Sequence, residues 1–126
     1  MLVIRSSQME AFRAQMRRQF EDRMVAHVWK VFPDQCEDLG GEVVRDAVRH
    51  GIERAEAHGF TIERDVVRYV DLTFLFGRDF DTDRSLPWAA AILADSRFDD
   101  QPSARMERLW DEAKTRRIDD RSPGRG

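Results

Sequence analysis

The sequence predicts an all-α fold: an irregular bundle of about five helices that follows a short extended N-terminal arm. Three observations lead to this prediction. Apolar residues recur at steps of three and four along most of the chain, as they do on the buried face of a helix. Residues typical of helix starts and helix ends separate these segments. No segment alternates apolar and polar residues over enough positions to indicate a β-strand.

Length and composition are those of one small globular domain. The chain has 126 residues, of which 41% are hydrophobic, and this is enough apolar material for a single core. We therefore expect residues 1–118 to form one helical domain. Residues 119–126 are polar and contain glycine and proline, so we expect them to form a flexible tail.

The chain opens with the apolar arm MLVIR, residues 1–5, which we expect to be extended. The first helix is predicted over residues 8–32, with Ser7 and Glu10 as a capping box and Pro33 as the residue that ends it. We interpret its apolar stripe as core, and the alternative is an adaptable methionine-rich surface. The stripe consists of Met9, Phe12, Met16, Phe20, Met24, Val28 and Val31.

Two longer helices are predicted in the middle of the chain. Residues 34–41 are predicted to be a connection, with a single helical turn inside it as the alternative. A second helix follows over residues 42–58, and Gly59 is expected to end it in a left-handed conformation. A third helix is predicted over residues 62–76, with Thr61 as its N-cap. It is the most apolar segment, so we expect it to lie at the centre of the bundle.

Two further helices are predicted near the C-terminus. Ser85 is expected to cap a short fourth helix over residues 86–95. Pro102 and Ser103 open the last helix, which we expect to reach about Arg117.

The segment RDFDTDRSLPW, residues 78–88, is the most unusual stretch of the chain. It places three aspartates at alternate positions: Asp79, Asp81 and Asp83. A calcium-binding loop begins in this way, but here Arg84 replaces its glycine and Ala90 replaces its bidentate glutamate. We therefore predict no calcium site. We expect a turn in which the aspartates accept hydrogen bonds from local backbone N–H groups or pair with the flanking arginines.

The remaining reactive side chains form no recognisable catalytic or metal-binding pattern. His27, His50 and His58 lack the spacing and the third ligand that a zinc site needs. Cys36 is the only cysteine, and the acidic residues around it disfavour a reactive thiolate. We predict that the chain is not an enzyme and that it has no metal and no cofactor.

A helix-turn-helix is the alternative interpretation of residues 54–70. Ala55 and Gly59 have the spacing of that motif, but the second helix would open with Glu63 and Asp65, which phosphates repel. The net charge of −3 also gives no basic field to attract nucleic acid. We expect an ordinary helical hairpin and no nucleic acid partner, while a small DNA-binding protein stays an alternative.

Several apolar side chains indicate a protein-binding surface. Phe80 and Trp88 flank the acidic loop, where we expect them to be exposed, and tryptophan is enriched at interface hot spots. Leu2, Val3 and Ile4 of the arm are further candidates, because an extended apolar segment can add to the edge of a partner's sheet. Packing within the bundle is the alternative for all five residues, and self-association into a homo-oligomer stays open.

The chain has neither a signal-peptide pattern nor an apolar stretch that approaches the roughly 20 residues needed to span a bilayer. We therefore expect a cytoplasmic protein without a membrane partner.

Three segments, residues 4–35, 48–81 and 86–95, together resemble small bacterial helical proteins encoded beside spike-tip and effector genes of the type VI secretion system. The resemblance covers about residues 3–115 and is most specific in GFTIERDVVRYVDLTFLFGRDFD and LPWAAAILAD. It implies a co-adaptor or co-chaperone that helps a larger adaptor load a toxic effector onto the secretion spike. Immunity proteins, which bind and block an effector, are encoded in the same clusters and are the alternative. The resemblance implies no active-site residues.

Overall fold

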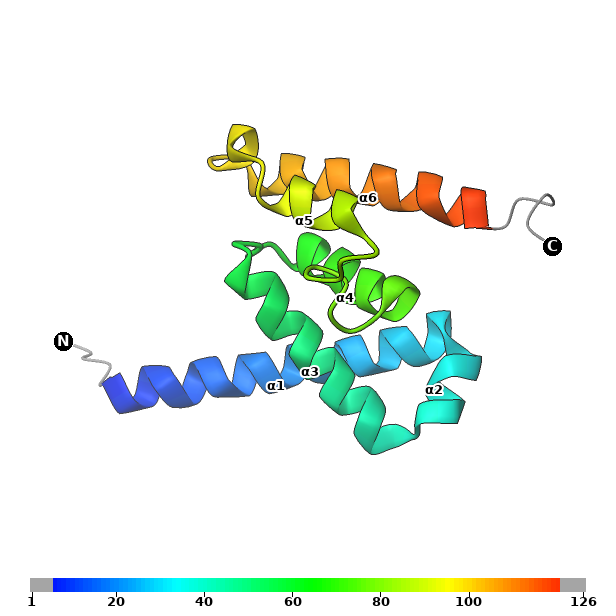
Figure 1. Cartoon of the computed structure of the whole chain (residues 1–126). Coiled ribbons are helices and arrows are strands. Elements are labelled where there is room, and N and C mark those ends of the chain that lie inside the picture. Colours follow the sequence, from blue (N-terminus) through cyan, green and yellow to red (C-terminus); the bar gives the residue numbers. More distant parts are fainter. Residues whose placement is uncertain (1–5, 121–126) are drawn as a thin grey trace. The chain divides into compact units, whose positions relative to one another are not determined.

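The computed structural model describes residues 6–120, and every regular element in that range is helical (Figure 1). The prediction of an all-α fold is confirmed, with one more α-helix than expected because the connection predicted over residues 34–41 contains α2. The elements are α1 (Ser6–Val31), α2 (Pro33–Leu39), α3 (Gly41–Ala57), α4 (Glu63–Phe76), α5 (Pro87–Leu93), the 3₁₀ turn η1 (Ser96–Phe98) and α6 (Pro102–Asp120).

The helices belong to two compact units, residues 1–49 and residues 50–126, and the division between them falls inside α3. We call them the N-terminal unit and the C-terminal unit. The single domain expected over residues 1–118 stays a prediction. The last helix continues to Asp120, which is two residues into the segment expected to be a tail.

In the N-terminal unit, the core lies around the C-terminal half of α1. Met24 and Val28 of α1 are buried, as is Cys36 of α2, whose Sγ donates a hydrogen bond to the Val28 carbonyl oxygen at 3.4 Å. Burial also raises the pKa of the Cys36 thiol. Pro33 ends α1 and is the first residue of α2, a position where its missing N–H group leaves no helical hydrogen bond unmade.

In the C-terminal unit, α4 is the most buried helix, as its apolar sequence predicts, and α6 packs against both α4 and α5 (Figure 1). Gly51 lets α3 approach α4 closely, because a Cβ atom at this position would lie 3.2 Å from Val70 Cγ2. Asp65 is buried and accepts a hydrogen bond from Ser103 Oγ at 2.5 Å, which ties the start of α4 to α6.

The helix ends are partly as expected. Gly59 has a φ of +91°, and the amide of Phe60 bonds back to the Ala55 carbonyl at 3.0 Å, so α3 ends in the predicted left-handed turn. The expected N-cap of α4 is wrong: Ile62 occupies that position in place of Thr61, without a side-chain hydrogen bond.

Two other predicted caps are also wrong. Ser7 lies inside α1, which begins one residue earlier, so it cannot form the capping box. Ser85 precedes the actual N-cap of α5, Leu86, and its amide and hydroxyl both bond to Asp83. In the range that the structure describes, no helix has the length and apolar character required to cross a membrane.

Candidate functional site

The three alternating aspartates of the loop between α4 and α5 have three different surroundings. Asp83 Oδ1 accepts hydrogen bonds from the Ser85 amide at 2.9 Å and the Ser85 hydroxyl at 2.7 Å, which confirms the predicted local turn at this position. Asp79 is exposed, and its Oδ1 lies 3.1 Å from His50 Nε2 on α3. Asp81 is buried and is also directed at α3.

Asp81 forms an ionic cluster with Arg54 and His58. Its Oδ2 accepts two hydrogen bonds from Arg54, one of them from Nε at 2.9 Å, and lies 2.8 Å from His58 Nε2. Burial by itself raises the pKa of Asp81, but the hydrogen bonds from His58 and Arg54 more than compensate, so the pKa lies below its ordinary value. Asp81 is therefore a buried carboxylate whose charge is matched by Arg54 of α3. We call Arg54, His58 and Asp81 the Asp81 cluster.

Aromatic rings pack beneath the Asp81 cluster. The Tyr69 ring centroid lies 5.0 Å from that of Phe80 and 5.7 Å from that of His58. Burial raises the pKa of Tyr69 far above its usual range, and the negative charge of Asp81 acts in the same direction. With its carboxylate already bonded on the protein side, the cluster has the arrangement of a structural anchor that holds the loop on α3.

The residues predicted to form a binding surface around this loop have different surroundings in the structure. The expectation that Phe80 is exposed is wrong: it is 1% exposed, because the anchored loop turns its ring inward against Tyr69. Trp88 is half-buried: its ring and that of Phe76 form a T-shaped pair with centroids 5.3 Å apart, and the Arg116 guanidinium lies 5.8 Å from the Trp88 centroid. An interface role for Trp88 stays a prediction. The other three candidates, Leu2, Val3 and Ile4, lie outside the described residues.

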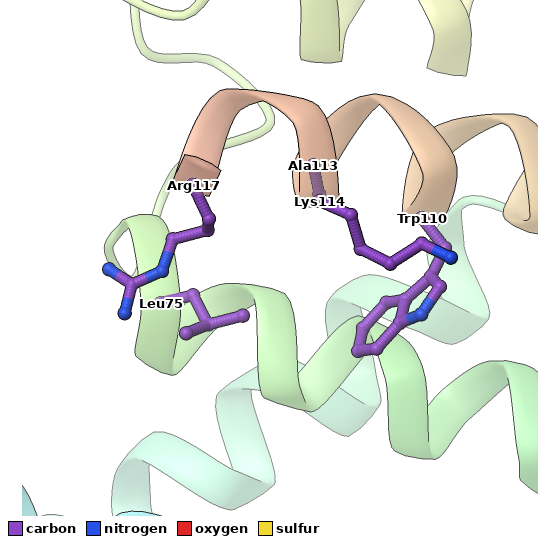
Figure 2. A pocket seen from close by; sticks show the side chains of 5 residues that line it. All are labelled: Leu75, Trp110, Ala113, Lys114 and Arg117. Carbon is purple, nitrogen blue, oxygen red and sulfur yellow. The ribbon is translucent and has the colours of Figure 1, made fainter. Parts of the chain in front are cut away.

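A small pocket lies between the end of α4 and the second half of α6 (Figure 2). Its volume is about 260 Å³, and it is lined by Leu75, Trp110, Ala113, Lys114 and Arg117. The guanidinium of Arg68, on α4, lies 5.3 Å from the Trp110 ring centroid and donates a hydrogen bond to Glu107 at 2.9 Å, which holds it against the indole. The pocket has room for one apolar side chain rather than for a drug-sized ligand.

The apolar stripe of α1 divides near its middle. Met24 and Val28 are 2% and 0% exposed, as expected for core residues. Met9, Phe12 and Met16 are 36%, 58% and 47% exposed, so the prediction that the whole stripe is core is wrong for its first half. Val31, at the far end, is also exposed. We call Met9, Phe12 and Met16 the exposed α1 face; they lie at i, i+3 and i+7, on one side of the helix.

An ionic network around the buried Glu21 holds the other half of α1 in place. Glu21 accepts hydrogen bonds from Arg45 at 2.9 Å and from Arg49 at 3.0 and 3.1 Å, and Arg45 also bonds to Asp22. The hydrogen bond from Arg49, reinforced by Arg45, lowers the pKa of Glu21 although burial opposes this. Sequence reasoning missed this network. Its signal is the placement of Arg45 and Arg49 four residues apart, on one side of a helix.

No group of three or more histidine, cysteine, aspartate or glutamate side chains in the described part of the chain is arranged to hold a metal ion. Comparison with protein-family models, with curated proteins and with solved structures finds no match to this chain.

Proposed function

We propose that the chain is a non-enzymatic protein-binding accessory factor. In this proposal it acts in the cytoplasm as a co-adaptor or co-chaperone that helps a larger adaptor load a type VI secretion effector. The exposed α1 face supports the binding role. The resemblance of residues 4–35, 48–81 and 86–95 to accessory proteins of secretion clusters supports the choice of process.

The exposed α1 face has the composition of a helix that docks into a groove. Phe12, the most exposed of its residues, is a large aromatic side chain of the kind that anchors interfaces. Met9 and Met16 lie on either side of it, and flexible thioether side chains adapt to irregular apolar surfaces. Helices that bind in grooves present apolar residues at this spacing. Removing these side chains from water supplies a driving force for association.

The second half of α1 keeps the first half helical before a partner binds. An isolated helix shorter than about 12–15 residues is marginal in water because its nucleation is unfavourable, so the exposed first half of α1 would be poorly formed alone. In α1, the buried side chains of Met24 and Val28 and the bonds of Glu21 to α3 fix the C-terminal half. The exposed half extends from a helix that is already formed, which reduces the entropy lost on binding.

Affinity purification of the tagged chain from its native host, with mass spectrometry, tests the proposal. The test variant replaces the exposed α1 face: Met9→Ser, Phe12→Ser and Met16→Ser. Ile62→Ser is the matched control, since Ile62 is an equally exposed apolar residue in the C-terminal unit. We expect an adaptor, together with its effector, at near-stoichiometric yield with the wild type and the control, and its loss with the triple variant. Absence of such a partner, or its retention by the triple variant, would contradict the proposal.

Co-expression with the effector distinguishes an accessory factor from an immunity protein. An accessory factor raises the amount or the delivery of the effector and leaves its toxicity to the host intact. If the chain alone restores the growth of cells that produce the effector, the immunity function is the correct one.

A further inference from the structure

We propose that the pocket between α4 and α6 binds the C-terminal residue of a partner protein. The large apolar side chain of that residue enters the hollow, and Arg117 and Lys114 bind its α-carboxylate. The pocket belongs to the C-terminal unit, whereas the exposed α1 face belongs to the N-terminal unit. The inference therefore adds a second binding site to the proposed function and does not depend on the exposed α1 face.

The hollow arises from the order of the side chains along α6. Four of its five lining residues lie on one side of that helix, at i, i+3, i+4 and i+7: Trp110, Ala113, Lys114 and Arg117. Ala113 is the smallest of them, and its methyl group leaves a space between its longer neighbours. Leu75 of α4 closes this space from the other side (Figure 2).

The hollow accepts one large apolar group. Its uncharged walls are the side chains of Leu75 and Ala113 and the indole of Trp110. The volume of about 260 Å³ is below the roughly 300 Å³ at which drug-sized sites begin, so a single side chain fills it. An aromatic ring suits the site best, because it can pack against the indole in an offset or edge-to-face arrangement.

Two basic side chains flank the hollow, and none of the five lining residues is acidic. Figure 2 shows Lys114 and Arg117 lying at its two sides. Among the side chains that the structure describes, no acidic group is bonded to Arg117. Lys114 Nζ lies 3.4 Å from Asp111 in an ion pair whose side chains are both more than half exposed. Such a pair is weak, and an ammonium group has three donors, so Lys114 can bind a second carboxylate.

These cations determine the charge of the occupant. Arg117 is half-buried, and a ligand that covers the pocket removes further water from its guanidinium group. A charge that loses water without gaining a partner opposes binding. A carboxylate restores the lost interactions, because a guanidinium group binds it through two parallel, charge-assisted hydrogen bonds. The complementary ligand therefore combines an apolar group with a carboxylate.

The apolar group and the carboxylate have to be close together, because the cations line the same pocket that receives the apolar group. Within a protein chain, the side chains of adjacent residues point to opposite faces of a strand or lie about 100° apart around a helix. At a C-terminal residue, by contrast, the side chain and the α-carboxylate share one Cα atom. Capture of a C-terminal carboxylate is also a recurring mode of peptide recognition.

The segments at the two ends of this chain do not supply such an occupant. Residues 1–5 contain apolar side chains, but their one charged side chain is that of an arginine. Residues 121–126 contain two arginines and no large apolar side chain. Either segment would bring more positive charge to Lys114 and Arg117, so the occupant we infer is a partner protein.

Three short labelled peptides with the same serine- and glycine-based sequence test this inference on the full-length chain. The first ends in phenylalanine with a free carboxylate, and the second ends in phenylalanine amide. The third carries phenylalanine followed by glutamate inside the sequence and ends in an amide. Fluorescence anisotropy gives the Kd values. We expect the first peptide to bind about tenfold more tightly than the other two, because only its carboxylate shares a Cα atom with the ring.

Variants assign that preference to the pocket. Arg117→Gln should bring the Kd of the first peptide close to that of the second. Arg108→Gln is the matched control, because Arg108 is an exposed arginine on the opposite side of α6, and it should keep the preference. Ala113→Met fills the hollow and should weaken the binding of the first two peptides, with circular dichroism to verify that the variant keeps its helices.

Four results would overturn the inference. They are equal Kd values for the first two peptides, no binding of the first peptide, a preference that survives Arg117→Gln, and binding of the third peptide as tight as that of the first. The last result would show that an internal acidic residue is recognised instead of a chain end.

The failure of this inference can be told apart from the failure of the proposed function. The triple variant of the exposed α1 face should bind the first peptide as the wild type does. If that variant loses its co-purified partner while no peptide binds, the binding function stands and the assignment of the pocket is wrong. If no partner co-purifies while the first peptide is preferred through Arg117, the pocket assignment stands and the proposed function fails.

Discussion

The two halves of α1 carry similar side chains in different surroundings. Met16 and Met24 belong to the same apolar stripe, yet Met16 is 47% exposed and Met24 is 2% exposed. Residues of α2 and α3 hold the second half through Val28, Glu21 and Asp22. The spacing of a stripe shows that side chains share a face, but only elements distant in the sequence decide which part of the face is covered.

The aspartates of the loop between α4 and α5 divide in the same way. Asp81 is buried with Arg54 and His58, whereas Asp79 and Asp83 are exposed. In both regions a regular pattern therefore contains a buried member, which we expect to contribute much to the stability of its own unit, and an exposed member, which we expect to contribute little. Matched substitutions measure this difference.

The largest difference is expected between the two methionines. Met24→Ala leaves a cavity in the core of the N-terminal unit and should lower the free energy of unfolding by about 3 kcal/mol. Met16→Ala removes an exposed side chain and should change it by no more than about 0.5 kcal/mol. Unfolding in urea, monitored by circular dichroism, gives the free energy of unfolding of each variant and checks both values. Equal losses for the two variants would mean that the stripe of α1 is covered along its whole length.

A smaller difference is expected between the aspartates. Asp81→Asn removes the charge that binds Arg54 and His58 in a buried position, and should lower the free energy of unfolding by about 2 kcal/mol. Asp79→Asn breaks only an exposed contact with His50, worth less than about 1 kcal/mol. Thermal unfolding of the two variants gives the comparison. A loss for Asp79→Asn as large as that for Asp81→Asn would show that the Asp81 cluster does not anchor the loop.

The Asp81 cluster also predicts a dependence of stability on pH. Because the pKa of Asp81 is held below its ordinary value of 3.8, its stabilising contribution is complete above the unfolded pKa and is lost as the pH falls through the lowered one. The stability gap between the wild type and Asp81→Asn should therefore be constant down to about pH 4 and close below it. Unfolding curves measured in that acidic range test the sign. A gap that widens in acid would contradict the assignment.

The helices were largely predictable from the sequence because their signals are local. Gly59 and Gly77 end α3 and α4 with positive φ angles, and the apolar spacing of α4 matches its burial. For α2 the sequence predicted no more than a single helical turn within a connection, since seven residues are too few to show a period. The expected caps failed at Ser7, Thr61 and Ser85 because each helix begins one or two residues away from the favourable residue.

The site was less predictable because its contacts join residues far apart in the sequence. Asp81 meets Arg54 and His58 across separations of 27 and 23 residues, and no local pattern marks such pairs. Phe80 was expected to be exposed because it lies in a polar loop, but the loop that Asp81 anchors turns its ring inward. The stripe of α1 was recognised, whereas its division depended on where α2 and α3 contact it.

Methionine oxidation tests the central claim, an open and a covered half of α1, most directly. The chain would be exposed briefly to dilute hydrogen peroxide and analysed by peptide mass spectrometry, which reports sulfoxide at each methionine. We predict fast oxidation of Met9 and Met16 and protection of Met24, with Met106, which is 0% exposed, as a second protected site. Protection of Met9 and Met16 to the level of Met24 would contradict the account, because the exposed α1 face would then be covered already.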